Sequence, residues 1–131
     1  MSAKLQLLIA SYCRALPLDV QALARTLSPA ADGTKAILGN LAEALERVHR
    51  IKGAGGSLGF EAVSRAAAQL EARLRALAAT GDDDGVEIGP MLESLVQLEE
   101  LAMTIRPEGS SLYGIDLSRI AAPARAFAGG T

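Results

Sequence analysis

Apolar residues recur at intervals of three and four along most of the chain, the spacing of helices that bury one face. The first stripe runs over residues 3–28, and Pro17 and Asp19 fall within it. Because proline stops or bends a helix and aspartate can cap a new one, the stripe predicts either one kinked helix or two. The apolar positions of this stripe are Leu5, Leu8, Ile9, Tyr12, Leu16, Val20, Leu23, Ala24 and Leu27.

Three further stripes predict three more helices. The second spans residues 34–58, the longest predicted helix, with Asp32 or Thr34 as its N-cap. The third follows a turn at residues 57–60 and continues to about residue 80, and the fourth lies between Pro90 and Pro107. Their inward positions are Ile37, Leu41, Leu45, Val48, Ile51 and Leu58, then Val63, Ala66, Ala67, Leu70, Leu74 and Leu77, then Met91, Leu95, Leu98, Ala102 and Ile105.

These stripes predict an all-α protein, an up-and-down four-helix bundle with an extra short N-terminal segment. The chain of 131 residues fits a single domain, with its core at about residues 3–106. Residues 107–131 form a weakly structured C-terminal tail in this prediction, with one short helical turn near residues 116–121. Aromatic content of 3% and the absence of Trp favour closely packed helices over a sheet.

Charge and cysteine content limit the classes of partner. The net charge is −2, without a basic cluster, so we expect no nucleic-acid binding. The one cysteine, Cys13, cannot form an internal disulfide, and we interpret it as a core side chain of a cytoplasmic protein. No apolar run approaches the roughly 20 residues of a membrane span, so we expect no membrane association. We also expect the protein to be a monomer.

Residues 48–60 carry the only histidine, His49, followed by several glycines inside the helical pattern. On a helix, Gly53, Gly56 and Lys52 fall within about 60° of the histidine. Glycine inside a helix is unfavourable by roughly 0.5–1 kcal/mol relative to alanine, so Gly53, Gly55 and Gly56 need a compensating reason. Close approach of another molecule to His49 is one such reason, and tight helix packing is another.

The residues His49, Lys52, Gly53, Gly56 and Gly59 resemble, in order and spacing, the motif of the histidine-containing phosphotransfer (HPt) family. The chain is especially similar to the amino-terminal phosphotransfer domain of chemotaxis-type histidine kinases, through Gly59, Phe60 and Glu71. The resemblance implies a phosphorelay protein that accepts a phosphoryl group on His49 from a sensor histidine kinase or a receiver domain. It then passes the group to a receiver-domain aspartate of a response regulator.

A polar partner for His49 should lie on the next helix, because an acceptor at Nδ1 would fix the tautomer that leaves Nε2 free to attack. His49 precedes the Gly59 turn by ten residues, about 15 Å of helix, so its neighbour lies ten to twelve residues beyond the turn. That window contains Gln69, Leu70 and Glu71, of which Leu70 points inward. Helical phase leaves Gln69 and Glu71 open, and the resemblance favours Glu71.

We expect Lys52 to attract the phosphoryl oxygens, and Arg50, Gly53 and Gly56 to lie at the partner interface. No metal ligands accompany His49, so we expect no cofactor, with Mg²⁺ supplied by the partner receiver domain. The chain has no glycine-rich nucleotide-binding segment, and we expect a phosphocarrier rather than an enzyme. The alternative is a non-catalytic helical adaptor that binds a partner through the Gly-rich face around His49.

Overall fold

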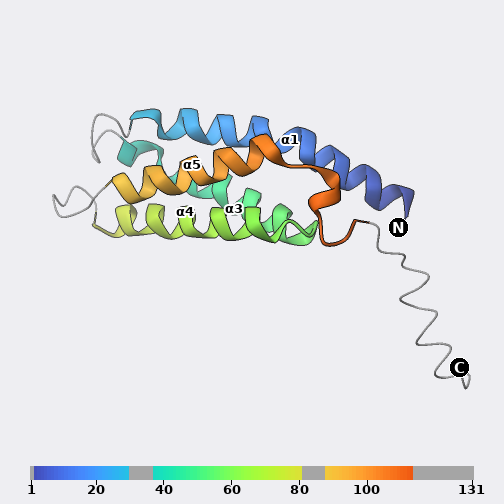
Figure 1. Cartoon of the computed structure of the whole chain (residues 1–131). Coiled ribbons are helices and arrows are strands. Elements are labelled where there is room, and N and C mark those ends of the chain that lie inside the picture. Colours follow the sequence, from blue (N-terminus) through green and yellow to red (C-terminus); the bar gives the residue numbers. More distant parts are fainter. Residues whose placement is uncertain (1, 30–36, 81–87, 114–131) are drawn as a thin grey trace, which may run out of the picture.

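The computed structural model describes residues 2–29, 37–80 and 88–113, and this part of the chain is helical (Figure 1). Its long helices are α1 (Ala3–Leu27), α3 (Leu41–Ser57), α4 (Glu61–Thr80) and α5 (Gly89–Thr104). Two short 3₁₀ turns, η2 (Leu38–Asn40) and η3 (Pro107–Gly109), adjoin α3 and α5. The predicted all-α four-helix bundle is confirmed.

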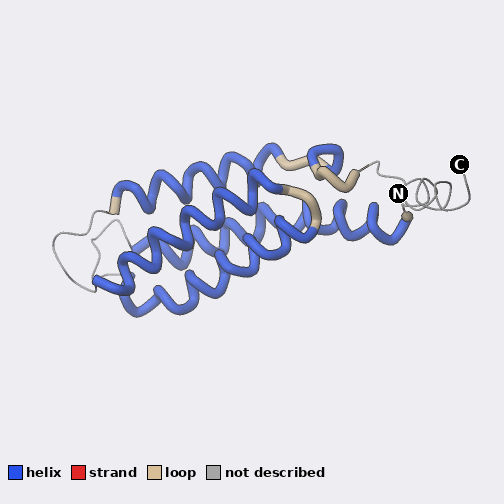
Figure 2. The backbone as a smooth tube through the Cα atoms, turned by 90° about the horizontal axis from the view of Figure 1, so that it is seen from below, coloured by secondary structure: helices blue, strands red, loops and turns tan. Residues whose placement is uncertain are grey.

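The helices form an up-and-down bundle in which each helix has two neighbours. α3 and α4 make the most extensive contact, and α1 packs against α3 and α5 while α5 packs against α4. α1 therefore lies diagonally opposite α4, and the face formed by α1 and α5 lies opposite the face formed by α3 and α4 (Figure 2). Inward side chains from all four helices make one core, which includes Ile9, Leu16, Leu23, Val48, Leu70, Leu74, Leu77, Met91 and Leu98.

The N-terminal stripe forms one continuous helix, so no separate short segment precedes the bundle. Pro17 lies inside α1, and Asp19 follows it within the helix instead of capping a second one. Leu16 and Val20 are both buried on either side of the proline, and this packing offsets the backbone hydrogen bond that proline removes. At 25 residues α1, not the 17-residue α3, is the longest described helix.

A few predicted core positions are more exposed than expected. Leu8 is 50% exposed although the adjacent Ile9 is fully buried, because the two side chains point about 100° apart around α1. Leu45, Leu58, Ile105 and Cys13 are partly buried and pack against the core. The expected N-cap at Asp32 or Thr34 and the helical turn near residues 116–121 lie outside the described residues.

The turn between α3 and α4 is held by the segment that follows α5. Gly59 has a φ of 83°, a left-handed conformation that glycine adopts without strain. Ser110, which is buried, donates a hydrogen bond from its hydroxyl to the Leu58 carbonyl, and the Ser111 amide donates to the Gly59 carbonyl at 2.9 Å. Residues 107–113 are thus packed onto the bundle, which corrects the prediction that the tail is weakly structured from residue 107.

By length and composition alone, α1 could cross a membrane, contrary to the expectation that no apolar run is long enough. Core helices of bundles satisfy the same criteria. Signal sequences near an N-terminus satisfy them as well, and α1 also buries Ile9, Leu16 and Leu23 against its neighbours, so its composition is weak evidence for a membrane span.

Candidate functional site

His49 lies in the middle of α3, on the side that faces α4. Its neighbours Val48 and Ile51 are buried in the core and fix the rotation of the helix. The histidine side chain itself is 64% exposed. An imidazole held at its base by a packed helix, with its ring open to solvent, is accessible to another molecule.

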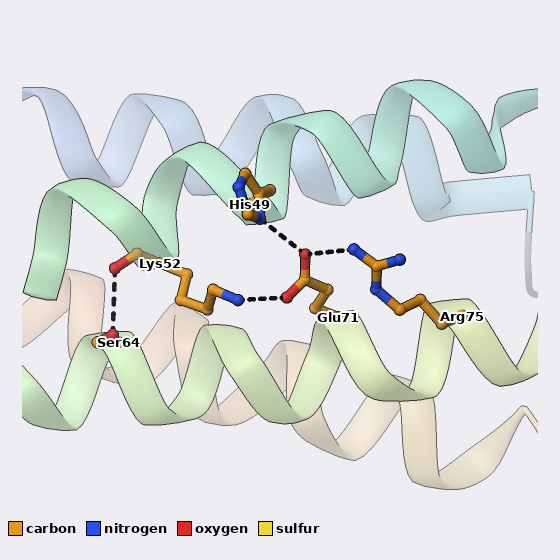
Figure 3. Close-up of polar contacts among 5 residues, drawn as sticks. All are labelled: His49, Lys52, Ser64, Glu71 and Arg75. Carbon is orange, nitrogen blue, oxygen red and sulfur yellow. Dashed lines mark hydrogen bonds and ion pairs between the residues drawn. The ribbon is translucent and has the colours of Figure 1, made fainter.

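Glu71 of α4 binds the imidazole and brings two cations to the same site (Figure 3). Its Oε2 lies 2.9 Å from His49 Nδ1 and also accepts a hydrogen bond from Arg75 Nη2 at 3.2 Å. Its Oε1 accepts a hydrogen bond from Lys52 Nζ at 2.7 Å. The Glu71 side chain is only 7% exposed, so these three partners compensate the burial of its charge.

The three donors keep Glu71 ionised. The hydrogen bond from Lys52, together with those from His49 and Arg75, outweighs burial and lowers the pKa of Glu71 to about 2. An ionised carboxylate can only accept hydrogen bonds, so the proton shared with His49 belongs to Nδ1. In the neutral ring this leaves the Nε2 lone pair unprotonated, the form that a nucleophile requires.

The glycines of α3 have different surroundings. A Cβ at Gly53 would meet nothing within 4 Å, whereas one at Gly55 would lie 3.1 Å from the Tyr12 hydroxyl oxygen and 3.3 Å from Val63 Cγ1. Gly55 therefore serves tight packing, the second of the two explanations considered from the sequence. Gly53 and Gly56 are exposed, so the surface beside His49 is free of large side chains from these positions.

Ser64 ties α4 to α3 next to the site. Its hydroxyl donates to the Lys52 carbonyl oxygen at 3.1 Å (Figure 3), and a Cβ at Gly56 would lie 3.3 Å from the Ser64 Oγ. This bond fixes the separation of the two helices close to the Lys52–Glu71 ion pair.

Two of the residues predicted to belong to the site lie away from the cluster of His49, Lys52 and Glu71. Gln69, the other candidate partner of His49, is on the opposite flank of α4, where it lines a groove with residues of α5. Arg50 is exposed and lines a pocket between α1 and α3 together with Tyr12 and Asp19. The structure therefore joins His49, Lys52 and Glu71 and leaves Arg50 on the neighbouring surface.

Sequence reasoning missed Arg75 and Ser64 as parts of the site. Arg75 lies four residues after Glu71, the spacing at which a carboxylate and a cation on one helix meet, and this signal was available from the sequence. Ser64 had no such signal, because its bond is to a backbone carbonyl on another helix. Within the described ranges, no group of three or more His, Cys, Asp or Glu residues is arranged to hold a metal ion.

A family model described as "Hpt domain" matches residues 7–106 of the chain. This stretch runs from the first turns of α1 past the end of α5 and includes His49, Lys52 and Glu71. The chain belongs to the Hpt domain family. Searches of curated proteins and of solved structures each found no match.

Membership of the family establishes the general role. Hpt domains carry a phosphoryl group on a histidine and interact with kinases and receiver domains in phosphorelays, so a histidine phosphotransfer role follows for this chain. The narrower similarity to the amino-terminal domain of chemotaxis-type kinases stays a prediction. His49 is the only histidine of the chain and lies within the matched residues.

Proposed function

We propose that this Hpt domain is a phosphocarrier in which His49 Nε2 accepts a phosphoryl group from a histidine kinase or a phosphorylated receiver domain. It then transfers the group to the aspartate of another receiver domain. The observation that carries the proposal is the 2.9 Å bond between His49 Nδ1 and the ionised Glu71. This bond directs the Nε2 lone pair away from α4 and towards solvent.

The transfer proceeds by two displacements at phosphorus. The Nε2 lone pair forms an N–P bond while the P–O bond to the donor, a receiver aspartyl phosphate or the ATP of a kinase, breaks, and the donor oxygen leaves with that electron pair. The imidazole gains positive charge, which the adjacent Glu71 carboxylate stabilises through Nδ1–H. In the second step an aspartate oxygen of the receiver attacks phosphorus, the N–P bond breaks, and its electron pair returns to Nε2.

Lys52 is proposed to attract the phosphoryl oxygens. Its ammonium group lies 2.7 Å from Glu71 Oε1 and its side chain is 32% exposed, so it shares the surface of His49 while staying anchored. A cation at this place favours a group whose charge is spread over three oxygens. The Mg²⁺ that phosphoryl transfer uses would come with the partner receiver domain.

The docking surface is proposed to include Gly53, Gly56 and the exposed Arg50. Open space at Gly53 lets the rim of a partner active site approach the imidazole. Arg50 extends this surface towards α1, where it can meet acidic side chains of a receiver. The single cysteine, Cys13, suits the reducing cytoplasm that we propose as the location.

The test is incubation of the full chain with phosphorylated receiver domains and with active histidine kinases, followed by measurement of acid-labile phosphate. Wild-type protein should take up label and His49→Gln should take up none. Since His49 is exposed, the variant should keep its fold, which circular dichroism checks. Binding of the His49→Gln variant to the same receiver should persist. A folded wild type that takes no label from any donor, while binding partners through this face, would favour the adaptor alternative.

A further inference from the structure

Arg75 makes the longest of the three hydrogen bonds to the Glu71 carboxylate. Its Nη2 donates to Glu71 Oε2 at 3.2 Å, whereas Lys52 Nζ donates to Oε1 at 2.7 Å. The Arg75 side chain is 65% exposed and that of Lys52 is 32% exposed. An ion pair with an exposed partner contributes little to stability, because water screens the charge and the long side chain loses freedom. Arg75 can therefore leave Glu71 with a small loss of free energy, while Lys52 stays paired with the buried carboxylate.

The guanidinium of Arg75 has N–H groups that the cluster does not use. Only Nη2 binds Glu71, and no described residue accepts a hydrogen bond from Arg75 Nε or Nη1. Several N–H groups in one plane match the oxygens of a phosphoryl group. Arg75 Nη2 and His49 Nδ1 bind the same carboxylate oxygen, so the guanidinium and the imidazole are neighbours (Figure 3). Arg75 is thus an exposed cation with unused donors beside the ring that carries the phosphoryl group.

Phosphorylation changes the charge balance of this cluster. Before phosphorylation, Glu71 carries one negative charge, Lys52 and Arg75 carry two positive charges, and the His49 ring is neutral, so one positive charge is in excess. A phosphoryl dianion on Nε2 adds two negative charges, and the ring that keeps its Nδ1–H gains one positive charge. The four side chains are then neutral together. The cation in excess of Glu71 is therefore balanced only when His49 carries the phosphoryl group.

We propose that Arg75 releases Glu71 when His49 is phosphorylated and binds the phosphoryl oxygens, while Lys52 keeps the carboxylate in place. The inference rests on the phosphorylation of Nε2 proposed above, and it assigns to Arg75 the retention of the group on the histidine. No bond to phosphorus forms or breaks in this exchange, because a hydrogen bond to a carboxylate is replaced by hydrogen bonds to phosphoryl oxygens. These new bonds exist only in the phosphorylated protein, so they shift the transfer equilibrium towards phosphorylated His49.

The first test follows the Arg75 Nε–H signal in ¹H–¹⁵N spectra of the full chain before and after phosphorylation with phosphoramidate. Its absence from the spectrum of Arg75→Gln identifies this signal. We expect it to move when wild type is phosphorylated, whereas the signal of Arg73, two residues away and on another side of α4, should stay. An unchanged Arg75 signal beside a phosphorylated His49 would overturn this inference and leave the proposed function intact. A folded wild type that takes up no phosphoryl group would overturn both.

The second test measures the equilibrium ratio of phosphorylated His49 to phosphorylated aspartate, with a receiver domain that exchanges the group with wild type. Arg75→Gln should lower this ratio by roughly three- to tenfold, as expected for an Arg–phosphate contact at an exposed site. Arg75→Lys, which keeps the charge, should restore part of the ratio. Arg73→Gln is the matched control, since it removes the same charge from another side of α4, and it should leave the ratio unchanged. Equal ratios in Arg75→Gln and Arg73→Gln would overturn the proposal.

A change of Glu71 separates a direct contact of Arg75 with the phosphoryl group from an effect through the carboxylate. In Glu71→Gln, Arg75 has no carboxylate to hold, so an effect that acts only through Glu71 would vanish. We expect Arg75→Gln to lower the same equilibrium ratio in this background as well, because Arg75 binds the phosphoryl oxygens themselves. Equal ratios in Glu71→Gln and in the double variant would show that Arg75 serves only to hold Glu71, and would contradict the inference.

Discussion

Glu71 and His49, 22 residues apart in the sequence, are joined across α3 and α4 by a 2.9 Å contact between Oε2 and Nδ1. Glu71 is nearly buried, while the imidazole it holds is largely exposed. A buried carboxylate fixed by two further cations is a rigid acceptor, and it sets both the tautomer and the direction of the ring. The reactivity proposed for His49 depends on this pair.

Removing the Glu71 charge should slow phosphorylation of His49. A hydrogen bond to a charged group contributes about 1.5–3 kcal/mol, so we expect Glu71→Ala to lower the rate about 10- to 100-fold. Glu71→Gln, whose amide oxygen still accepts from Nδ1, should lose about tenfold. The rate of acid-labile phosphate formation with one donor measures both. Gln69→Ala is the control on the opposite flank of α4, and equal losses in Gln69→Ala and Glu71→Ala would contradict the assignment.

Acid should remove the stabilising contribution of Glu71. Its pKa is lowered from 4.5 to about 2 in the folded protein, so the ionised form stabilises the fold above the unfolded pKa. Wild type should exceed Glu71→Gln in free energy of unfolding by on the order of 2 kcal/mol at pH 6. This difference should shrink as the pH falls from about 4.5 towards 2. Urea unfolding across this range tests it, and a difference that is the same at both ends would refute the ion cluster.

The two glycines Gly53 and Gly55 should respond to alanine with opposite signs. Gly55→Ala places a Cβ against Tyr12 and Val63 and should destabilise the protein by about 1–3 kcal/mol. Gly53→Ala meets open space inside a helix and should stabilise it by about 0.5–1 kcal/mol. Thermal unfolding of the two variants side by side provides the comparison. Destabilisation by Gly53→Ala would show that this position is packed.

The positive charge of Lys52 should increase the rate at which His49 is phosphorylated. Lys52→Met removes the cation next to the proposed phosphoryl position and should slow phosphorylation about tenfold, less than for a buried donor because the ammonium is partly solvated. Lys52→Arg should retain most of the rate. Rates with a small-molecule phosphoryl donor separate this effect from partner docking. If Lys52→Met is as fast as wild type, Lys52 serves only to hold Glu71.

Much of the bundle could be predicted from the sequence, because the apolar period of each helix is strong. The inward positions of α4, from Val63 to Leu77, are all buried as predicted. The continuous helix through Pro17 was harder to predict. Proline locally favours the end of a helix, whereas burial of Leu16 and Val20 favours its continuation, and in the structure the helix continues. The packing of residues 107–113 onto the bundle depends on long-range hydrogen bonds of Ser110 and Ser111 to the turn at Leu58 and Gly59, which no local pattern predicts.

The residues of the candidate site could be predicted from the sequence only as far as helical phase distinguishes them. The turn at Gly59 placed both Gln69 and Glu71 level with His49, and phase alone left the choice open. Packing of Leu70 and Leu74 fixes the rotation of α4 and directs Glu71 towards α3. The different surroundings of Gly53, Gly55 and Gly56 likewise depend on the neighbouring helices, so the sequence could only show that an explanation was needed.

The most direct measurement of the central claim is ¹H–¹⁵N NMR of the imidazole after phosphorylation with a small donor such as phosphoramidate. Because His49 is the only histidine, its ring nitrogens give one unambiguous set of signals. We expect a phosphoryl group on Nε2, with Nδ1 still protonated and bonded to Glu71, and no phosphohistidine in His49→Gln. Phosphorylation at Nδ1, or none at all on the folded wild type, would contradict it.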